Sequence, residues 1–181
     1  MAEREQLPVG EARGGDAAAW NVLFQRYQLP LYVYVYELVR NEQASLDLVQ
    51  ETFISAVRHI RTLQHDEKFG GWLFGIAHQK CLQQWRRQGR DAVLRDELAD
   101  APTADDDLPL DRLLREEQEA ELMNLLDQLP LPQRSVLLLH FIEDFSLEEI
   151  AGITGAPLGT VKSRLHYAKR ALRKLLEEPS P

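Results

Sequence analysis

The sequence predicts an all-α protein, built as two small helical domains of four helices each that an acidic linker joins. Three observations lead to this prediction. Apolar residues recur at spacings of three and four over most of the chain, which is the period of an amphipathic helix. No segment finds an evident partner strand. Between the two helical stretches the composition changes to acidic residues, Ala and Pro, with few side chains that build a core.

Length, hydropathy and cysteine content narrow the class of protein. The 181 residues suffice for one domain or two small ones, and 44% of them are hydrophobic, which favours folded cores over disorder. No apolar run approaches the ~18 residues that span a bilayer, and the N-terminus lacks the pattern of a secretion signal. The single cysteine, Cys81, excludes an internal disulfide framework and fits a reducing compartment. We therefore expect a cytoplasmic protein.

The net charge of −8 hides an uneven distribution of charged residues. Residues 91–121 hold twelve acidic residues against three basic ones, whereas 69–90 and 157–176 hold four and six basic residues and no acidic one. Two basic surfaces are therefore expected, separated by an acidic connector. A nucleic acid responds to such local fields rather than to the average charge.

The first helices of the chain are predicted from caps and periodicity. Asp16 is a plausible N-cap for a helix over 17–28, which Pro30 ends, and the helical pattern resumes over 31–40. The alternating Tyr and Val residues of 32–36 have strand propensity. We interpret them as helix because helical patterns flank them closely.

Two further helices follow in the first half. Asn41 is a candidate cap for the third helix, and 63–71 reads as a polar loop that ends in glycine. A fourth helix is predicted from about Trp72 to Arg87. The third helix has a regular apolar stripe formed by Leu46, Val49, Phe53, Val57 and Ile60.

In the second half, the helical pattern returns over 113–127 and again as a short apolar helix over 133–141. Ser146 and Glu149 then form a capping box. Gly155 suits the left-handed residue that ends a helix. Pro157 suits the first turn of the last helix, whose buried stripe is predicted to be Val161, Leu165, Ala168, Leu172 and Leu175.

The last helix is basic on the side that faces away from its apolar stripe. Together with the capping box, the glycine stop and the proline restart, this predicts a helix-turn-helix whose second helix lies in the major groove of DNA. A solvated helix face is the ordinary alternative. The outward residues are Thr160, Lys162, Ser163, Arg164, His166, Tyr167, Lys169, Arg170 and Arg173.

Two more surfaces in the first half have a functional interpretation and an ordinary one. The fourth helix combines cations, amides and aromatic residues, a composition that suits single-stranded nucleic acid but also a solvated face; these residues are His78, Gln79, Lys80, Gln83, Gln84, Trp85, Arg86, Arg87 and Arg90. The loop before it offers a place for an unstacked base. The third helix presents an acidic face that fits either a protein partner or solvent, formed by Asp47, Gln50, Glu51 and Arg58 with Leu48 and Ile54 at its margin.

An enzyme is the least favoured class. His78 and Cys81 lie three residues apart on a predicted helix, with His59 and His65 nearby, which raises zinc binding or a nucleophilic thiol. No second cysteine and no tight cluster of ligands accompanies them. We therefore expect no catalytic residue, no metal and no cofactor, and we interpret Cys81 as a small core residue.

The motifs resemble those of one family in their order and spacing, from about Asp16 to Leu176. The family is the extracytoplasmic-function (ECF) group of bacterial RNA polymerase sigma factors. The motifs that carry the resemblance are Asp47-Leu-Val-Gln-Glu-Thr-Phe, Trp72-Leu-Phe-Gly-Ile-Ala, Arg86-Arg87, Leu129-Pro-Leu-Pro-Gln-Arg, Ser146-Leu-Glu-Glu-Ile-Ala and Gly159-Thr-Val-Lys-Ser-Arg-Leu.

The resemblance implies a division of the chain into three parts. Residues 16–90 would form the sigma region 2 domain, which docks on core polymerase and recognises and melts the minus-10 element. Residues 91–112 would be the acidic linker. Residues 113–178 would form the sigma region 4 domain, whose helix-turn-helix recognises the minus-35 element.

It also implies partners and contact residues. The protein would bind the clamp helices of the largest polymerase subunit through Asp47, Gln50, Glu51 and Ile54. The minus-10 element would be contacted by Lys68, Phe69, His78, Gln79, Gln83, Arg86 and Arg87. The minus-35 element would be contacted by Thr160, Lys162, Ser163, Arg164, His166, Tyr167 and Arg170. An anti-sigma factor is a further expected partner.

One departure from the family concerns the minus-10 contacts. Relatives commonly carry Arg-Asn after the Ile-Ala pair and Asp four residues later, where this chain has His78, Gln79 and Gln83. This affects the choice of minus-10 base and not the melting role. The alternative function is a free-standing helix-turn-helix regulator, which would bind duplex DNA without polymerase.

Overall fold

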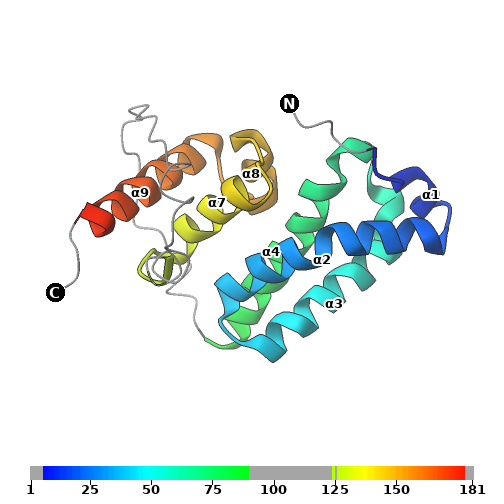
Figure 1. The fold of residues 1–181 in the computed structure, drawn as a ribbon, viewed down its shortest axis with the longest axis horizontal. Coiled ribbons are helices and arrows are strands. Elements are labelled where there is room, and N and C mark those ends of the chain that lie inside the picture. The colour runs from blue at the N-terminus through cyan, green and yellow to red at the C-terminus, as the bar shows by residue number, and fades with distance from the viewer. Residues whose placement is uncertain (1–5, 90–123, 125, 178–181) are drawn as a thin grey trace. The chain divides into compact units, whose positions relative to one another are not determined.

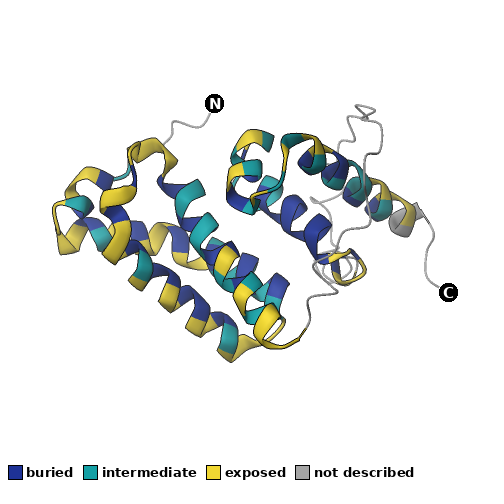
Figure 2. Ribbon diagram, turned by 180° about the vertical axis from the view of Figure 1, so that it is seen from behind, coloured by how far each residue is buried: buried dark blue, intermediate teal, exposed yellow. Residues whose placement is uncertain are grey.

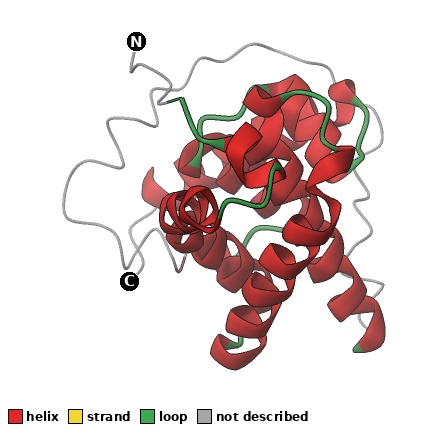
Figure 3. Cartoon of the chain, turned by 90° about the vertical axis from the view of Figure 1, so that its right-hand side faces the viewer, coloured by secondary structure: helices red, strands yellow, loops and turns green. Residues whose placement is uncertain are grey.

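The computed structural model describes residues 6–89, 124 and 126–177. Within these ranges the regular structure is helical and no strand occurs (Figure 3). The chain divides into two compact units, Met1–Trp85 and Arg86–Pro181. The predicted all-α fold with two small helical domains is thus confirmed. The predicted acidic linker, and the helix over 113–127 apart from its last residues, lie outside the described part.

The first unit is a bundle of long helices with a short one at its start (Figure 1). Its elements are α1 (Val9–Arg13), α2 (Ala17–Val39), α3 (Glu42–His59), the 3-10 turns η1 (Ile60–Thr62) and η2 (Asp66–Lys68), and α4 (Phe69–Arg87). The predicted caps are confirmed, since the Asp16 side chain accepts a hydrogen bond from the N–H of Ala18 and Asn41 accepts one from Ala44. The helix α1 was not predicted from the sequence.

The predicted break at Pro30 is wrong, because α2 runs through this residue without interruption. A proline inside a helix removes one backbone hydrogen bond and costs about 3 kcal/mol relative to alanine. The helix continues because one apolar face on both sides of Pro30 packs into the same core. The buried residues of that face include Leu23, Tyr27, Leu31, Tyr34, Val35 and Leu38.

The phase of the apolar stripe on α3 also differs from the prediction. Leu46 and Val57 are exposed, Val57 to 52%, whereas Leu48 and Ala56 are buried together with Val49 and Phe53. The buried face of α3 therefore also includes small and hydroxylated residues, among them Ser45 and Thr52. Their hydroxyls donate hydrogen bonds to the backbone carbonyls of the preceding turn. Figure 2 shows the division between the inner and outer sides of these helices.

The helix α4 begins at Phe69, three residues before the predicted start at Trp72. Phe69 is buried and its ring contacts the rings of Trp20, Tyr27 and Trp72. Gly70 is needed beneath it, because a Cβ there would lie 2.9 Å from the hydroxyl oxygen of Tyr27. The sequence predicted a loop here because of the two glycines, Gly70 and Gly71. The aromatic packing around Phe69 explains why the helix includes them.

The second unit consists of α7 (Leu131–Ile142), α8 (Leu147–Thr154) and α9 (Leu158–Glu177) in its described part. The helix α7 begins two residues earlier than predicted, with a proline in its first turn. The guanidinium of Arg134 donates to the carbonyls of Asp127 and Leu129, which closes the turn before this helix.

The predicted capping box and glycine stop of α8 are confirmed. The N–H of Glu149 donates to the Ser146 hydroxyl at 3.1 Å, and the N–H of Ser146 donates to the Glu149 carboxylate at 2.8 Å. Gly155 has φ of +72°, the left-handed geometry expected of it. The helix α9 begins at Leu158, one residue after Pro157, and its confirmed buried stripe is Val161, Leu165, Ala168 and Leu172.

Candidate nucleic-acid and polymerase interfaces

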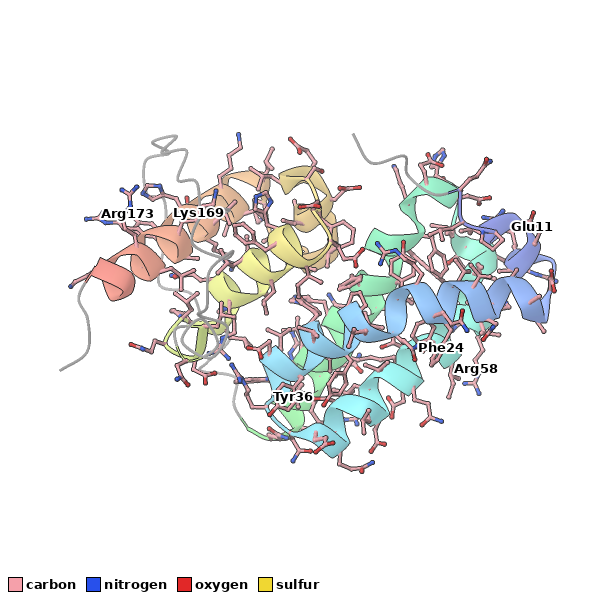
Figure 4. All side chains as sticks on the ribbon, viewed as in Figure 1. Glu11, Phe24, Tyr36, Arg58, Lys169 and Arg173 are labelled. Carbon is pink, nitrogen blue, oxygen red and sulfur yellow. The ribbon has the colours of Figure 1, made fainter. Side chains whose placement is uncertain are left out.

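The helix α9 carries a line of basic residues on its solvent side. Lys162, His166, Lys169 and Arg173 recur at spacings of four, three and four, which places them in one row along the helix. Lys162, Arg170 and Arg173 are exposed. Figure 4 shows Lys169 and Arg173 projecting from the same side of α9. Each member of the row directly follows a member of the buried stripe, so the row lies beside the stripe, about 100° around the helix. The row is therefore accessible to a partner while the stripe stays packed in the core.

The predicted minus-35 residues differ in their exposure. Thr160, Arg164, His166 and Tyr167 are half-buried, and the rings of His166 and Tyr167 meet edge to face at 5.5 Å between centroids. Ser163 is buried, and its hydroxyl donates to the carbonyl of Gly159 at 3.0 Å. The structure thus places Ser163 within the helix packing and not on the outer surface predicted for it.

The turn between α8 and α9 fixes the angle at which α9 is presented. Gly155 ends α8 by donating its N–H to the Ala151 carbonyl, and the Pro157 carbonyl accepts the N–H of Val161 at the start of α9. Ile150, Ile153 and Val161 are buried between these elements. The arrangement is that of a helix-turn-helix, in which the second helix is held rigidly by the first.

The helix α4 presents a second surface that combines amides, cations and aromatic side chains. Trp72, Ile76, Gln79 and Gln83 follow one another at spacings of four, three and four, so they lie in one row. The row leads to Arg86 and Arg87 in the last turn of the helix. Trp72 and Ile76 are half-buried, and Gln79, Gln83, Arg86 and Arg87 are exposed, as is Lys68 before the helix.

Two residues of the predicted minus-10 set lie inside the unit and not on this surface. Phe69 is 1% exposed within its aromatic cluster. His78 is 6% exposed, and its Nδ1 shares a hydrogen bond of 2.8 Å with the hydroxyl of Tyr34 on α2. Both residues therefore support the surface from beneath in this structure. Local spacing put His78 on the helix correctly but did not reveal which side it occupies, and Phe69 had been placed in the loop before the helix.

The solvent face of α3 is a mixed apolar and acidic surface. Asp47, Gln50 and Glu51 are exposed together with Ile54, which is 43% exposed. Leu46 and Val57, which the sequence had placed in the core, add to this face. Large apolar side chains left in solvent at helical spacing are typical of a surface that a partner covers.

The neighbouring helix α2 extends this surface. Phe24 is 41% exposed, and its ring lies 4.9 Å between centroids from the ring of the buried Phe53. Figure 4 shows Phe24 of α2 and Arg58 of α3 on the same side of the first unit. We call the exposed residues Phe24, Leu46, Asp47, Gln50, Glu51, Ile54 and Val57 the α3 face.

A contact links the α3 face to the α4 surface. The Nζ of Lys80 on α4 lies 3.8 Å from the carboxylate of Glu51 on α3. The pair is partly exposed, so its contribution to stability is small, about 0–1 kcal/mol.

Cys81 lies in the core, where burial raises the pKa of its thiol to about 12. A thiol with this pKa stays protonated at neutral pH and is a poor nucleophile or metal ligand. Among the described residues, no group of three or more His, Cys, Asp or Glu side chains is arranged to hold a metal ion. No helix in the same ranges is long and apolar enough to cross a membrane.

Two family models match the chain, one on each unit. Residues 23–91 match the model described as Sigma-70 region 2, and residues 119–172 match the model described as Sigma-70, region 4. Together with the helix-turn-helix and the mixed α4 surface, these matches define a sigma factor of the sigma-70 type. Sigma factors are transcription initiation factors and not enzymes.

Similar proteins show to which group of sigma factors the chain belongs. The ECF RNA polymerase sigma factor SigW of Bacillus subtilis is 30% identical over 94% of this chain and 95% of SigW. The RNA polymerase sigma-H factor of Pseudomonas aeruginosa is 31% identical over 97% of this chain and 95% of that protein. The chain belongs to the extracytoplasmic-function group of RNA polymerase sigma factors. It is an alternative sigma factor that directs transcription initiation.

Solved structures have the same fold. CnrH, solved in complex with the cytosolic domain of CnrY, superposes with a TM-score of 0.68 at 24% identity, over 95% of this chain and 96% of CnrH. The sigma factor RpoE of Bartonella quintana was solved in complex with the anti-sigma factor NepR. It superposes with a TM-score of 0.65 at 25% identity, over 87% of this chain and 98% of RpoE.

Proposed function

We propose that the two units divide the promoter between them. Residues 16–90 dock on core polymerase and melt the minus-10 element, residues 113–178 recognise the minus-35 element, and residues 91–112 form an acidic linker between the two domains. The observation that carries this proposal is the pair of basic helical surfaces, one on α4 and one on α9, in a chain whose net charge is −8. Such local cationic surfaces attract DNA phosphates despite the overall charge.

The helix α9 is proposed to enter the major groove at the minus-35 element. In helix-turn-helix proteins the N-terminal part of the recognition helix contacts base edges, while cations farther along contact phosphates. Thr160, Lys162, Arg164, His166, Tyr167 and Arg170 are assigned to this surface, with Ser163 fixing the backbone of the first turn. Each good bidentate contact with a base contributes about 1–3 kcal/mol of discrimination.

The helix α4 is proposed to hold the melted minus-10 element. Gln79 and Gln83 offer amides to base edges, and the half-buried Trp72 offers an aromatic surface next to them. Lys68, Arg86 and Arg87 lie at the two ends of the row, where they can contact phosphates. Stacking and hydrogen bonds to unpaired bases offset the few kcal/mol that unstacking costs. Phe69 and His78 are proposed to act indirectly, by holding α4 in place.

The α3 face is proposed to bind the clamp helices of the largest polymerase subunit. Its apolar residues provide surface that gains free energy when water leaves it, at roughly 25 cal/mol per Å². Asp47 and Glu51 add charge complementarity to a basic partner. The exposure of Leu46, Ile54 and Val57 in an otherwise well-packed helix supports this assignment.

An anti-sigma factor is proposed as an inhibitory partner, since RpoE of Bartonella quintana is solved with one. We further propose that the chain acts in the cytoplasm and has no catalytic activity of its own. Its contribution to initiation is then binding energy alone, directed to particular promoter sequences.

The experiment is run-off transcription with bacterial core polymerase and the full chain on genomic promoter fragments. The test variant is Lys162→Ala/Arg170→Ala, which removes two cations from the N-terminal and middle parts of α9. The matched control is Arg173→Ala/Lys174→Ala, which removes two exposed cations from its last turns. We expect the test variant to lose at least about tenfold in initiation and the control to lose much less.

Equal losses in the two variants, or no loss in either, would show that α9 does not read the promoter. The alternative of a free-standing regulator is tested by an electrophoretic shift. A sigma factor shifts promoter duplex only with core polymerase, whereas a free-standing regulator shifts it alone.

A further inference from the structure

The short helix α1 is tied to the segment that leads into α4. A guanidinium nitrogen of Arg13 donates to the carbonyl of Leu63 at 3.2 Å, and it also forms a hydrogen bond and ion pair with the carboxylate of Asp66. Leu63 and Asp66 lie three residues apart in the segment 63–68. Two attachment points so close together restrain the backbone between them, so that fewer conformations remain accessible to the segment.

The helix α1 is itself firmly held by the body of the first unit. Val9 and Ala12 are each 1% exposed. The Nε1 of Trp20 donates to the carbonyl of Ala12 at 2.9 Å, and the Trp20 ring contacts Phe69, the first residue of α4. Arg13 therefore connects the segment 63–68 to a fixed point. Figure 4 shows Glu11 of α1 at the outer edge of the first unit.

The segment 63–68 has buried ends and an exposed middle. Leu63 is buried, and so is Phe69, which directly follows the segment. The residues between them are all exposed: Gln64, His65, Asp66, Glu67 and Lys68. This pattern leaves five consecutive polar side chains available at the start of the α4 surface, with a backbone whose path Arg13 limits.

We propose that Arg13 is a positioning residue for promoter melting. It orders the segment 63–68 before DNA binds. Capture of an extruded minus-10 base then loses less conformational entropy, because the segment is already ordered. Arg13 acts through its contacts with Leu63 and Asp66 and does not itself touch DNA. The inference rests on the proposed function of the α4 surface, to which it adds a supporting element outside the predicted DNA contacts.

The experiment uses the holoenzyme, formed from the full chain and bacterial core polymerase, on promoter DNA with 2-aminopurine at the extruded minus-10 position. Two quantities are measured: the fraction of unstacked base at equilibrium, and the ratio of unstacking between the preferred base and a substituted one. We expect Arg13→Ala to lower the unstacking equilibrium about tenfold, because it removes both the partly exposed ion pair with Asp66 and the charge-assisted hydrogen bond to the Leu63 carbonyl. We also expect it to reduce the base ratio.

Two further variants separate positioning from folding and from charge. The exchange Arg13→Asp/Asp66→Arg restores the ion pair with reversed charges and should recover part of the unstacking, although the bond to the Leu63 carbonyl stays lost. Arg61→Ala removes an exposed cation next to the segment and should leave both quantities near wild type. The base ratio compares two templates with the same protein sample, so partial unfolding does not change it.

The outcomes distinguish this inference from the function on which it rests. If Lys68→Ala and Gln83→Ala leave unstacking unchanged, the assignment of the α4 surface is wrong. If those variants reduce unstacking while Arg13→Ala retains the wild-type equilibrium and base ratio, only the role of Arg13 is overturned. An equal loss of unstacking in Arg13→Ala and Arg61→Ala would mean that the loss comes from the removed positive charge. This result would also overturn the positioning role of Arg13.

Discussion

The hydroxyl of Tyr34 and the Nδ1 of His78 lie 2.8 Å apart in the interior of the first unit and join α2 to α4. The Tyr34 ring also packs on Phe74, so this hydrogen bond sits within an aromatic core. It holds the middle of α4, where His78 directly precedes the exposed Gln79 of the proposed minus-10 surface. The bond therefore connects the stability of the unit to the presentation of that surface.

Tyr34→Phe is expected to destabilise the first unit by about 1–3 kcal/mol, because it removes the hydroxyl while leaving a polar ring nitrogen buried. For a unit of this size, each kcal/mol lowers Tm by roughly 4–8 °C. Thermal unfolding followed by circular dichroism measures the change. Tyr32→Phe is the matched control, since Tyr32 is half-buried on the same helix and stacks on Tyr36. A larger effect in the control than in Tyr34→Phe would contradict the role of the bond.

Pro30→Ala is expected to raise the stability of the first unit by about 1–3 kcal/mol, because it returns an N–H to the interior of α2. Urea unfolding measures the shift of the midpoint. Leu29→Ala serves as the control, since Leu29 is 66% exposed and contributes little to the core. A loss of stability in Pro30→Ala would mean that the core depends on the shape that the proline gives to α2.

Gly155→Ala and Gly152→Ala form a matched pair in the helix-turn-helix. A Cβ meets no atom within 4 Å at either position, but Gly155 has φ of +72° whereas Gly152 lies inside α8. The first substitution should cost the second unit roughly 1–2 kcal/mol of stability through backbone strain. The second should gain about 0.5–1 kcal/mol. Equal effects in chemical denaturation would show that the turn does not require a left-handed residue.

Cys81 is expected to resist thiol reagents in the folded protein. Burial raises the pKa of its thiol from 9.0 to about 12, so at pH 8 only about one molecule in ten thousand carries the reactive thiolate. Reaction with a disulfide reagent should be slow in buffer and fast in denaturant. Rapid stoichiometric reaction in buffer would show that the thiol is accessible.

The same shift in pKa predicts the pH dependence of stability. Because the folded-state pKa is the higher one, the contribution of Cys81 is complete below pH 9 and falls as the pH rises from 9 toward 12, where the unfolded chain loses its thiol proton first. The difference in unfolding free energy between the wild type and Cys81→Ala should shrink over this range. A constant difference would contradict the buried, neutral thiol.

Local signals in the sequence correctly predicted the helix ends that are fixed by a capping side chain or by a left-handed glycine. Asp16, Asn41, Ser146 and Gly155 act through hydrogen bonds or backbone angles within four residues of their own positions, so the neighbouring sequence contains the whole interaction. The basic and apolar sides of α9 were predicted for the same reason. A helix of 20 residues with a single buried stripe shows its period clearly.

Interactions between distant residues were not predictable in this way. The helix α2 continues through Pro30 because its apolar face packs against other helices, and α4 begins early because Phe69 meets Trp20 and Tyr27. These contacts join residues that lie far apart in the chain.

The side of a helix on which a site residue lies was the least predictable property. His78 and Ser163 carry polar groups that suit DNA, yet each satisfies its hydrogen-bonding group inside its own unit. Leu46 and Val57 are apolar, yet they are exposed on the α3 face. Apolar residues placed for a partner follow the same helical period as core residues, so periodicity alone does not separate the two.

The decisive measurement is transcription by bacterial core polymerase with and without the purified chain, on promoter and non-promoter fragments, together with direct binding of the chain to the core enzyme. We predict that the chain associates with core polymerase and yields transcripts of defined length from promoter fragments only, and that Ile54→Asp weakens both. A chain freed of any bound inhibitor that does not associate with core polymerase, or that shifts promoter duplex equally well without it, would contradict the assignment as a sigma factor.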